Sequence, residues 1–304
     1  MNVIYTEDLN FQFGNVPIIK GLKLEVPQNS IYGFLGPNGA GKSTSIKLIL
    51  GLLRPASGQI RIFDQMMQDN KMAILSRIGN MIESPSLYQH LTAWDNLHYL
   101  DILFKKGKRR MEEVLDLVGL THAKKKKVKH FSMGMKQRLG IAMALFHDPD
   151  LLILDEPVNG LDPAGIQEMR KLFNRLQEMG KTVFISSHLL AEIEKTCTHL
   201  GIIQKGELLY QGEINSLLET ATRSIQLKVS SAEDAANAII PMQLEFNVID
   251  QNSIKVQIPS DEAFDQLIRK MVLENIAVYD VERQTASLED LFIGLTASPK
   301  NQLA

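Results

Sequence analysis

The chain has 304 residues, of which 44% are hydrophobic and 22% are charged, and its formal net charge is −2 at pH 7. This composition is typical of a soluble globular protein with a real core, and the length accommodates one large domain or two modest ones. The slightly negative charge excludes bulk electrostatic binding of nucleic acid, so we expect no nucleic-acid partner.

Three features of the sequence predict a cytoplasmic protein. Cys197 is the only cysteine, so no internal disulfide can form, which suits a reducing compartment. The N-terminus has no basic start, and its early acidic pair, Glu7 and Asp8, is unlike a signal peptide. No apolar run approaches the ~18 residues of a membrane-spanning helix. If the chain serves a membrane process, a separate chain must supply the spans.

The first part of the chain predicts short strands and turns. Candidate strands cover residues 3–5, 22–26 and 31–35. Phe11 and Phe13 lie on one side of an alternating segment. Phe13 is a candidate surface for stacking a nucleobase, and the alternative is packing in a core or on a hairpin face.

A phosphate-binding loop follows the strand at 31–35, and a helix is expected over 44–53. The loop fits the pattern Gly, four residues, Gly-Lys-Ser/Thr with Gly36, Pro37, Asn38, Gly39, Ala40, Gly41, Lys42, Ser43 and Thr44. Its glycines let backbone N–H groups turn toward phosphate oxygens, and the helix N-terminus adds a favourable dipole. Lys42 is placed to reach the β- and γ-phosphates, Ser43 to bind Mg²⁺, and Thr44 to add a phosphate contact.

After the first helix, the sequence predicts a strand over 57–63, a short helix over 71–77 and a strand over 78–83 that ends in Glu83. Helices then dominate the segment from about residue 84 to 148. Thr92 and Asp95 resemble a capping box that starts a helix, and helices are also expected over 111–118 and 134–146. The basic run 124–127 predicts a solvated loop or helix end, with contact to anionic lipid or nucleic acid as the alternative.

Two adjacent carboxylates follow the apolar strand 151–154. This strand has the continuous apolar character of a parallel sheet covered on both faces. Burial of Asp155 and Glu156 is costly without a compensating cation, so a metal–nucleotide site explains them better than packing does. Asp155 is the candidate Mg²⁺ ligand, and Glu156 is the candidate that polarises an attacking water. A helix over 163–179, a strand over 182–186 and a hairpin of strands 200–203 and 208–210 complete this part.

Beyond about residue 222 the pattern changes to an accessory α+β domain of ferredoxin-like type. Strands are expected over 225–229, 246–249, 254–258 and 276–281, and helices over 232–239, 262–273 and 288–295. The sequence thus predicts two domains, 1–221 and 222–304.

The start of the helix at 134 resembles the signature of the ATP-binding-cassette (ABC) ATPases. That signature is usually Leu-Ser-Gly-Gly-Gln followed by Gln/Lys-Gln-Arg. Here Ser132, Gly134, Gln137 and Arg138 match, whereas Met133 and Met135 replace a Gly and the Gln. The segment ending in Asp162 is similar to the family's D-loop, with Asn159 for the usual Ser, and His188 is similar to its switch histidine.

The resemblance covers residues 1–220 and implies a P-loop α/β fold with a RecA-like core sheet, an antiparallel β part and the inserted helical subdomain. It further implies that two cassettes pair head to tail, with ATP and Mg²⁺ between the phosphate loop of one and the Ser132–Gly134 region of the other. Glu156 is then the general base, His188 reports the γ-phosphate, and Phe13 takes the adenine-stacking position. Closure and opening of the pair would drive a membrane permease from the cytoplasmic face.

One departure from the usual ABC pattern indicates a particular group within the family. Most cassettes have Gln where this chain has Glu83, whose extra charge near the metal is expected to tighten Mg²⁺ binding or slow turnover. Glu83, the segment 131–142 and the C-terminal segment 287–292 are similar to the bacitracin-resistance and lantibiotic-immunity exporters of bacteria. The expected function is ATP-driven export of a peptide antibiotic or a similar amphiphile.

Two alternative functions differ from that of an exporter subunit. The first is a soluble ABC ATPase of DNA repair or translation, but such proteins usually have long coiled-coil insertions or two fused cassettes, and this chain offers neither. The second alternative is a regulatory ATPase whose C-terminal domain senses a ligand and gates hydrolysis. A plainer role for residues 222–304 is to stabilise the dimer.

Overall fold

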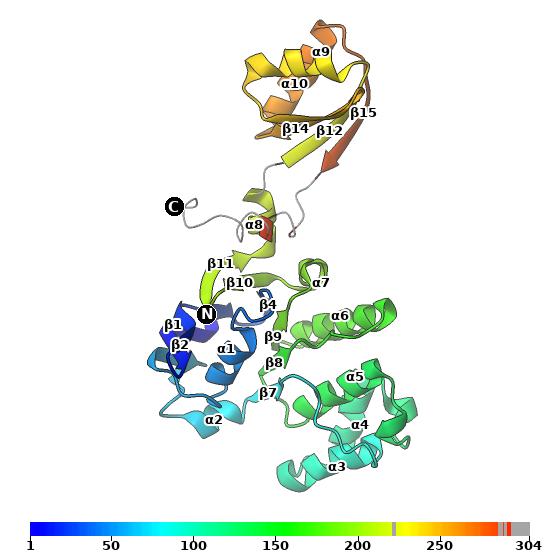
Figure 1. Ribbon diagram of the computed structural model, residues 1–304. Coiled ribbons are helices and arrows are strands. Elements are labelled where there is room, and N and C mark those ends of the chain that lie inside the picture. Colours follow the sequence, from blue (N-terminus) through cyan, green and yellow to red (C-terminus); the bar gives the residue numbers. More distant parts are fainter. Residues whose placement is uncertain (221–222, 285–287, 289–290, 293–304) are drawn as a thin grey trace. The chain divides into compact units, whose positions relative to one another are not determined.

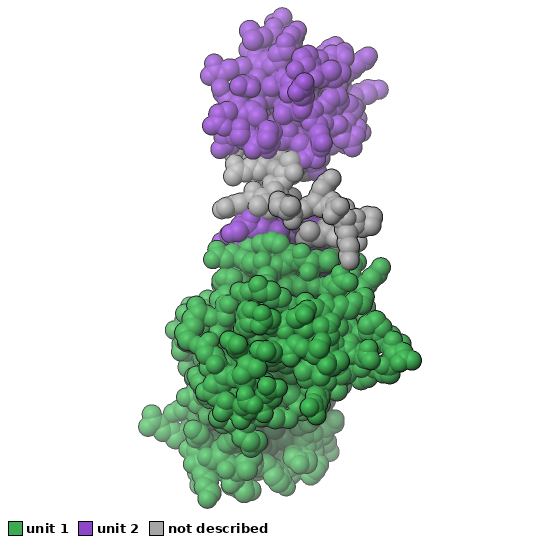
Figure 2. Space-filling view, turned by 90° about the vertical axis from the view of Figure 1, so that its left-hand side faces the viewer, with its two compact units in different colours: residues 1–214 green, residues 215–304 purple. Residues whose placement is uncertain are grey.

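The computed structural model describes residues 1–220, 223–284, 288 and 291–292. The chain divides into two compact units, residues 1–214 and 215–304, which Figure 2 shows in different colours. The predicted domain boundary at 221–222 falls on residues outside the described set, as does most of the helix predicted over 288–295. Among the described residues, no helix is both long and apolar enough to cross a bilayer.

A six-stranded sheet forms the centre of the first unit (Figure 1). Its order is β11-β10-β4-β9-β8-β7, and all neighbours are parallel except the β10–β11 hairpin. The strands are β4 (Ile31–Leu35), β7 (Ile78–Met81), β8 (Leu151–Asp155), β9 (Thr182–Ser187), β10 (His199–Gln204) and β11 (Glu207–Glu213). β4, β8 and β9 are buried along their whole length, as expected for a parallel sheet covered on both faces.

Helices α1 (Lys42–Ile49), α6 (Pro163–Glu178) and α7 (Leu190–Thr196) each follow one of the central strands. Because β4, β9, β8 and β7 are parallel neighbours, the loops that leave their carboxyl ends meet at one edge of the sheet. That edge holds the phosphate loop, the Asp155–Glu156 pair, His188 and Glu83. The topology therefore brings together residues that are far apart in the sequence.

An antiparallel sheet completes the nucleotide-binding part. Its order is β2-β1-β5-β6, with β3 also paired to β1, and its strands are β1 (Asn2–Phe13), β2 (Val16–Leu22), β3 (Glu25–Pro27), β5 (Ser57–Ile62) and β6 (Gln65–Met66). The prediction of one strand over 22–26 was wrong. The buried hydroxyl of Thr6 donates to the carbonyl of Leu22 at 2.8 Å and accepts from the N–H of Leu24 at 2.9 Å. These side-chain bonds, together with the bond from the N–H of Thr6 to the carbonyl of Leu24, interrupt the regular ladder between Leu22 and Glu25, and the strand breaks.

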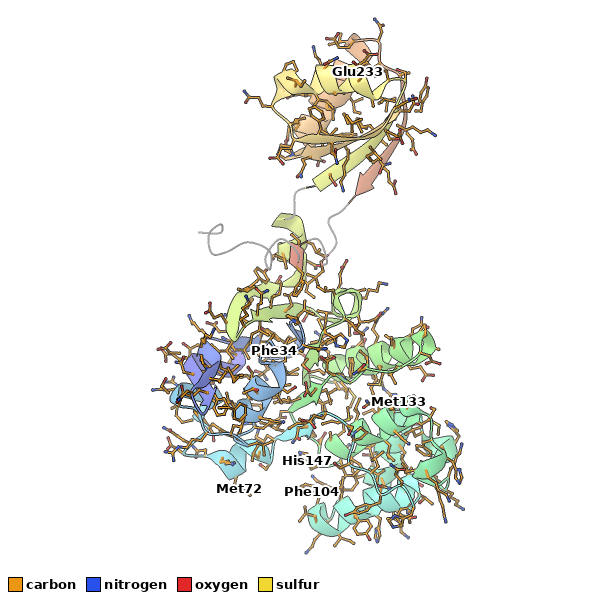
Figure 3. The ribbon with its side chains drawn as sticks, in the orientation of Figure 1. Phe34, Met72, Phe104, Met133, His147 and Glu233 are labelled. Carbon is orange, nitrogen blue, oxygen red and sulfur yellow. The ribbon has the colours of Figure 1, made fainter. Side chains whose placement is uncertain are left out.

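The core lies between the two sheets and α1, and it is built around aromatic rings. Phe34, which Figure 3 labels inside the first unit, is fully buried. The rings of Tyr32 and Phe184 stack at 5.6 Å beside it. Cys197 is buried, and burial raises the pKa of its thiol well above the ordinary value. It is therefore a packing residue rather than a reactive one.

The helical subdomain consists mainly of α3 (Ala93–Phe104), α4 (Gly107–Leu117) and α5 (Met133–Ala144), after the short helix α2 (Lys71–Leu75). The predicted capping box is confirmed, because the hydroxyl of Thr92 accepts from the N–H of Asp95 and the Asp95 carboxylate accepts from the N–H of Thr92. α4 begins four residues before the predicted start at Met111. The carboxylate of Asp101 accepts from the N–H of Gly107 at 2.6 Å, which fixes the turn between α3 and α4.

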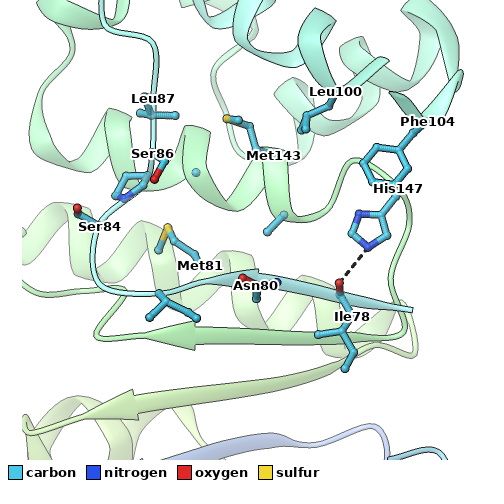
Figure 4. Close-up of a pocket in the computed structure, with 14 residues that line it drawn as sticks. Ile78, Asn80, Met81, Ser84, Ser86, Leu87, Leu100, Phe104, Met143 and His147 are labelled. Carbon is cyan, nitrogen blue, oxygen red and sulfur yellow. Dashed lines mark hydrogen bonds between the residues drawn. The ribbon is translucent and has the colours of Figure 1, made fainter. Parts of the chain in front are cut away.

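His147 joins the end of this subdomain to β7. Its Nε2 lies 3.1 Å from the carbonyl oxygen of Ile78, and its ring stacks on Phe104 at 5.0 Å (Figure 4). Burial lowers the pKa of His147 below its ordinary value, although the bond to the Ile78 carbonyl opposes this shift. The neutral ring is therefore favoured in the folded state.

We expect His147 to make the folded state less stable in acid. Because its folded pKa is lowered, the unfolded chain binds the proton more readily, and the free energy of unfolding falls as pH drops below about 6.5. Chemical unfolding at several pH values should show this fall in the parent chain, and the fall should be smaller in His147→Gln, which keeps a donor. The exposed His122→Gln is the control and should follow the parent. Parallel pH curves for the parent and His147→Gln would contradict the prediction.

The second unit has its own core and a β-α-β-β-α-β order. Its elements are β12 (Arg223–Val229), α9 (Ala232–Ile239), β13 (Phe246–Asp250), β14 (Ser253–Ile258), α10 (Asp261–Leu273) and β15 (Val278–Gln284), after α8 (Ile214–Thr220). The antiparallel sheet order β13-β14-β12-β15 is the ferredoxin-like arrangement predicted from the sequence. Leu227, Val256, Leu267 and Met271 are buried in this core.

Candidate active site

The phosphate loop is shaped by close backbone approaches and by two glycines with positive φ, Gly39 and Gly41. Gly41 caps α1 with φ 111°, a conformation that residues with a side chain rarely adopt. A Cβ at Gly36 would collide with the carbonyl oxygen of Ile203, so the backbone packs against β10 there. The N–H of Gly206 donates to the carbonyl of Ala40 at 3.0 Å. Neighbouring strands therefore hold the loop in one shape.

Lys42 is a buried cation surrounded by oxygen atoms. Its side chain is 6% exposed, and its Nζ donates to the carbonyls of Gly36 at 2.7 Å and Pro37 at 3.4 Å. The same Nζ lies 3.3 Å from Oε1 of Glu156. A desolvated ammonium held in this way is placed to bind a phosphate oxygen strongly. The predicted helix start at residue 44 is two residues too late, because α1 already begins at Lys42.

Glu156 connects Lys42 to His188. Its Oε2 lies 2.8 Å from Nδ1 of His188, and its side chain is 20% exposed. The backbone of Glu156 is in the left-handed region with φ 50°, which costs about 1–3 kcal/mol in a non-glycine residue. Its N–H donates to the hydroxyl of Ser186 at 3.0 Å, which helps to hold this conformation. The strained turn aims the carboxylate at the phosphate loop.

Asp155 lies deeper than Glu156 and is bonded to a residue that the sequence analysis did not select. It is 2% exposed, and the hydroxyl of Ser186 donates to its Oδ1. Ser186 therefore contacts both members of the acidic pair. The sequence did contain a signal for it, since Ser186 is a polar residue at the carboxyl end of an apolar strand, two residues before His188.

The predicted Mg²⁺ donors are hard oxygen atoms. Ser43 is partly buried in the first turn of α1, Asp155 ends β8, and Glu83 follows β7. Within the described part of the chain, no group of three or more His, Cys, Asp or Glu side chains could hold a metal ion. Mg²⁺ in nucleotide sites needs no such group, because one or two protein oxygens, phosphates and water complete its shell. The residues present therefore fit this ion.

Glu83 follows β7 and pairs with Lys47, a residue of α1 that the sequence analysis did not select. The Lys47 Nζ lies 3.0 Å from Oε1 of Glu83, and the Glu83 side chain is 69% exposed. Glu83 is also in the left-handed region, with φ 63°. Its extra negative charge is thus balanced by a neighbouring lysine in this arrangement.

A second group of predicted residues lies on the exposed surface. Ser132 caps α5, where its hydroxyl accepts from the N–H of Met135 at 3.3 Å, and Asp162 caps α6, where Oδ1 accepts from the N–H of Gly165 at 2.9 Å. A Cβ at Gly134 would lie 3.7 Å from Leu161, so the two helix starts are neighbours. Met133, labelled in Figure 3, is 55% exposed at the first position of α5.

Phe13 stands at the end of β1 and is 55% exposed. Its ring meets the edge of the Phe11 ring at 4.8 Å. Phe11 instead packs against the core, so the two aromatic residues differ in environment. Phe13 is therefore not packed in the core, and its role in stacking a nucleobase stays a prediction.

A cavity of about 430 Å³ separates β7 from the helical subdomain (Figure 4). Met81, Ser84 and Pro85 line it on the side of the Glu83 loop, and Leu100, Phe104 and Met143 line it on the side of α3 and α5. The lining is mixed apolar and polar, which suits binding of an amphipathic protein segment.

These contacts define what the edge of the sheet can do chemically. A buried cation, a loop of backbone N–H groups and a helix N-terminus provide a site for phosphate groups. A carboxylate beside that cation, bonded to an imidazole, can polarise a water molecule next to the phosphate. The combination is suited to hydrolysis of a nucleoside triphosphate.

Comparison with known proteins agrees with this chemistry. The family described as ABC transporter matches residues 19–159. The bacitracin transport ATP-binding protein BcrA of Bacillus licheniformis is 44% identical over 300 residues, covering 96% of this chain and 97% of that protein. The lantibiotic transport ATP-binding protein SrtF of Streptococcus pyogenes is 41% identical over 207 residues, covering 68% of this chain and 89% of that protein.

Solved structures of the same kind share the fold. An ATP-binding subunit of an ABC transporter matches with a TM-score of 0.64 and 28% identity, covering 71% of this chain and 92% of that one. The cbiO1 subunit from Clostridium perfringens, part of the ABC transporter complex cbiONQ, matches with a TM-score of 0.67 and 26% identity, covering 79% of this chain and 95% of that one. The chain therefore belongs to the ABC transporter family, as an ATP-binding subunit that hydrolyses ATP.

Proposed function

We propose that residues 1–221 form the ATPase cassette of a peptide-antibiotic exporter and that Glu156 is its general base. The observation that supports this most directly is the chain of contacts from Lys42 through Glu156 to His188. These contacts connect the segments that follow the carboxyl ends of β4, β8 and β9. Residues 222–304 are the accessory α+β domain.

In the proposed reaction, Lys42 and the N–H groups of residues 36–44 hold the β- and γ-phosphates of ATP. The γ-phosphate competes with Glu156 for Lys42, which releases the carboxylate from its ion pair. Glu156 then accepts the proton of the attacking water, and His188 stays bonded to Glu156 and contacts the γ-phosphate. The carboxylate is thus masked until the substrate arrives.

Mg²⁺ is the proposed cofactor, held by the hydroxyl of Ser43 and the carboxylate of Asp155, with Glu83 nearby. When bound, it offsets the negative charge of the phosphates. Ser186 fixes the orientation of the Asp155 carboxylate through its hydroxyl.

Two cassettes are proposed to pair head to tail. Ser132, Gly134 and Asp162 are neighbours on the exposed surface, where their helix starts leave N–H groups facing outward. Such an N-terminus favours an anion. We infer that this surface of one cassette covers the phosphate loop of the second, with Phe13 of that second cassette stacking on adenine.

A separate multi-spanning permease is the proposed membrane partner, which places the cassette on the cytoplasmic face of the cell membrane. The cavity beside β7 is the proposed point of contact, because residues 84 and 85, directly after Glu83, line it. Movement of the Glu83 loop on ATP binding would then reach the permease directly.

The similarity to BcrA over nearly the whole chain favours bacitracin or a related peptide as the exported substrate. In the native host, a strain carrying Glu156→Gln should become as sensitive to bacitracin as a strain lacking the chain. A strain carrying Glu178→Gln, an exposed residue at the end of α6, should keep its resistance. Unchanged bacitracin sensitivity in the Glu156→Gln strain would reject this substrate class.

The Lys47–Glu83 pair should set the Mg²⁺ dependence of hydrolysis. Glu83→Gln removes negative charge and should raise the Mg²⁺ concentration needed for half-maximal ATPase rate. Lys47→Met leaves Glu83 without its lysine and should lower the Mg²⁺ concentration needed for half-maximal ATPase rate. Each shift should be about two- to fivefold, since exposed ion pairs contribute ~0.2–1 kcal/mol. Rates and Mg²⁺ dependence that stay the same in both variants would contradict a role for this charge.

A further inference from the structure

The lysine run at 124–127 is fixed to the start of α3 rather than lying in a free loop. The N–H of Trp94 donates to the carbonyl of Lys124 at 3.0 Å, and Thr92 and Lys127 form an isolated antiparallel bridge. The N–H of Val128 donates to the carbonyl of Leu91 at 2.9 Å. These long-range bonds hold the run in one conformation, so a ligand there would meet a preorganised row of lysines.

A cavity of about 490 Å³ lies where this run meets α3 and α4. It is lined by Thr92, Trp94, Asp95, Lys108, Glu112, Lys124 and Lys125. Trp94 is the only tryptophan of the chain. The Lys124 Nζ lies 5.4 Å from the centre of its ring, so the indole is already beside one cation. The site thus combines an aromatic surface with several ammonium groups.

Both carboxylates of the cavity already have partners. Asp95 accepts from the hydroxyl of Thr92 at 2.6 Å as part of the capping box, and Glu112 pairs with Lys124 at 3.3 Å. Lys108 and Lys125 have no ion-pair partner among the residues that the structure describes. The uncompensated charge in the cavity is therefore positive, although the chain as a whole is slightly negative.

We propose that this cavity binds a phosphate-bearing anion through Lys108 and Lys125, with an apolar part of the ligand against Trp94. Two ammonium groups can each donate charge-assisted hydrogen bonds to phosphate oxygens. The paired state of Asp95 and Glu112 removes the repulsion that free carboxylates would add. The phosphate can come from a lipid headgroup or from a free anion, and both sources offer the same recognition chemistry.

Fluorescence of Trp94 reports on this cavity directly, because no other tryptophan contributes. The full-length chain is titrated with inorganic pyrophosphate in one arm and with vesicles of phosphatidylglycerol and phosphatidylcholine in the other. Vesicles of phosphatidylcholine alone are the blank for the second arm. All chains contain Lys42→Met, so that the phosphate loop does not contribute. Calorimetry on the same samples detects binding that leaves the emission unchanged.

The proposal predicts saturable binding in at least one arm, weakened by added salt. The double variant Lys108→Gln/Lys125→Gln should bind at least about tenfold more weakly, because two charge-assisted hydrogen bonds are lost. The control Lys171→Gln/Lys195→Gln changes the net charge equally at exposed positions and should bind like the parent. Pyrophosphate binding alone identifies a soluble ligand, and vesicle binding alone identifies a lipid. No binding in either arm, or equal weakening in both double variants, would overturn the proposal.

Discussion

Replacement of Glu156 by Gln should lower the ATPase rate by at least about a hundredfold, because a general base typically contributes ~10²–10⁴-fold. The amide keeps the shape of the side chain and its hydrogen bonding to His188, but it cannot accept the proton of the attacking water. ATP binding should persist, because Lys42 and the loop N–H groups are unchanged. Loss of the Lys42–Glu156 ion pair should even favour the nucleotide, which no longer competes with a carboxylate.

Steady-state turnover and equilibrium ATP binding, measured on the same preparation, check this prediction. Glu178→Gln is the matched control, since it makes the same chemical change at an exposed position at the end of α6. It should match the parent in both measurements. Turnover close to the parent rate in Glu156→Gln would remove Glu156 from the role of general base, and loss of ATP binding would show that its main role is structural.

Replacement of Lys42 by Met should abolish measurable ATP binding at concentrations that saturate the parent. The variant loses the one ammonium held at 2.7 Å from the Gly36 carbonyl and leaves Glu156 facing the phosphates without its cation. Repulsion from that carboxylate adds to the lost attraction, so affinity should fall by more than about a hundredfold, or ~3 kcal/mol.

Lys171→Met is the control for the Lys42 variant, because Lys171 is an exposed lysine of α6. Calorimetric titration with ATP measures both chains, and a thermal melt establishes that each is folded. A folded Lys42→Met chain that binds ATP like the parent would show that the backbone N–H groups alone determine affinity. Lys42 would then lose its assigned role in holding the phosphates.

The sequence was most informative where the chemistry is local. The phosphate loop, the Asp155–Glu156 pair and the capping box at Thr92 each occupy a few consecutive residues, and their flanking strands and helices could be predicted from periodicity. The ferredoxin-like second unit could be predicted for the same reason, since its strands and helices alternate in a regular order.

Contacts between distant segments could not be predicted. The break between β2 and β3 depends on the hydroxyl of Thr6, which lies far from Leu22 in the sequence. The pairing of Glu83 with Lys47 and the bonding of Ser186 to Asp155 depend on which strands are neighbours in the sheet. The lysine run at 124–127 has the composition of a solvated loop, and only its bonds to residues 91–94 show that it is fixed.

The proposed link between ATP hydrolysis and a membrane permease is tested most directly by co-purification. A tagged Glu156→Gln chain is isolated from detergent-solubilised membranes of the native host, with and without Mg²⁺ and ATP. We expect a multi-spanning membrane protein to co-purify with the chain, and to be retained more strongly with Mg²⁺ and ATP, when the paired cassettes are closed. A dimer that forms with ATP but retains no membrane protein would contradict the transporter function and favour a soluble ABC ATPase.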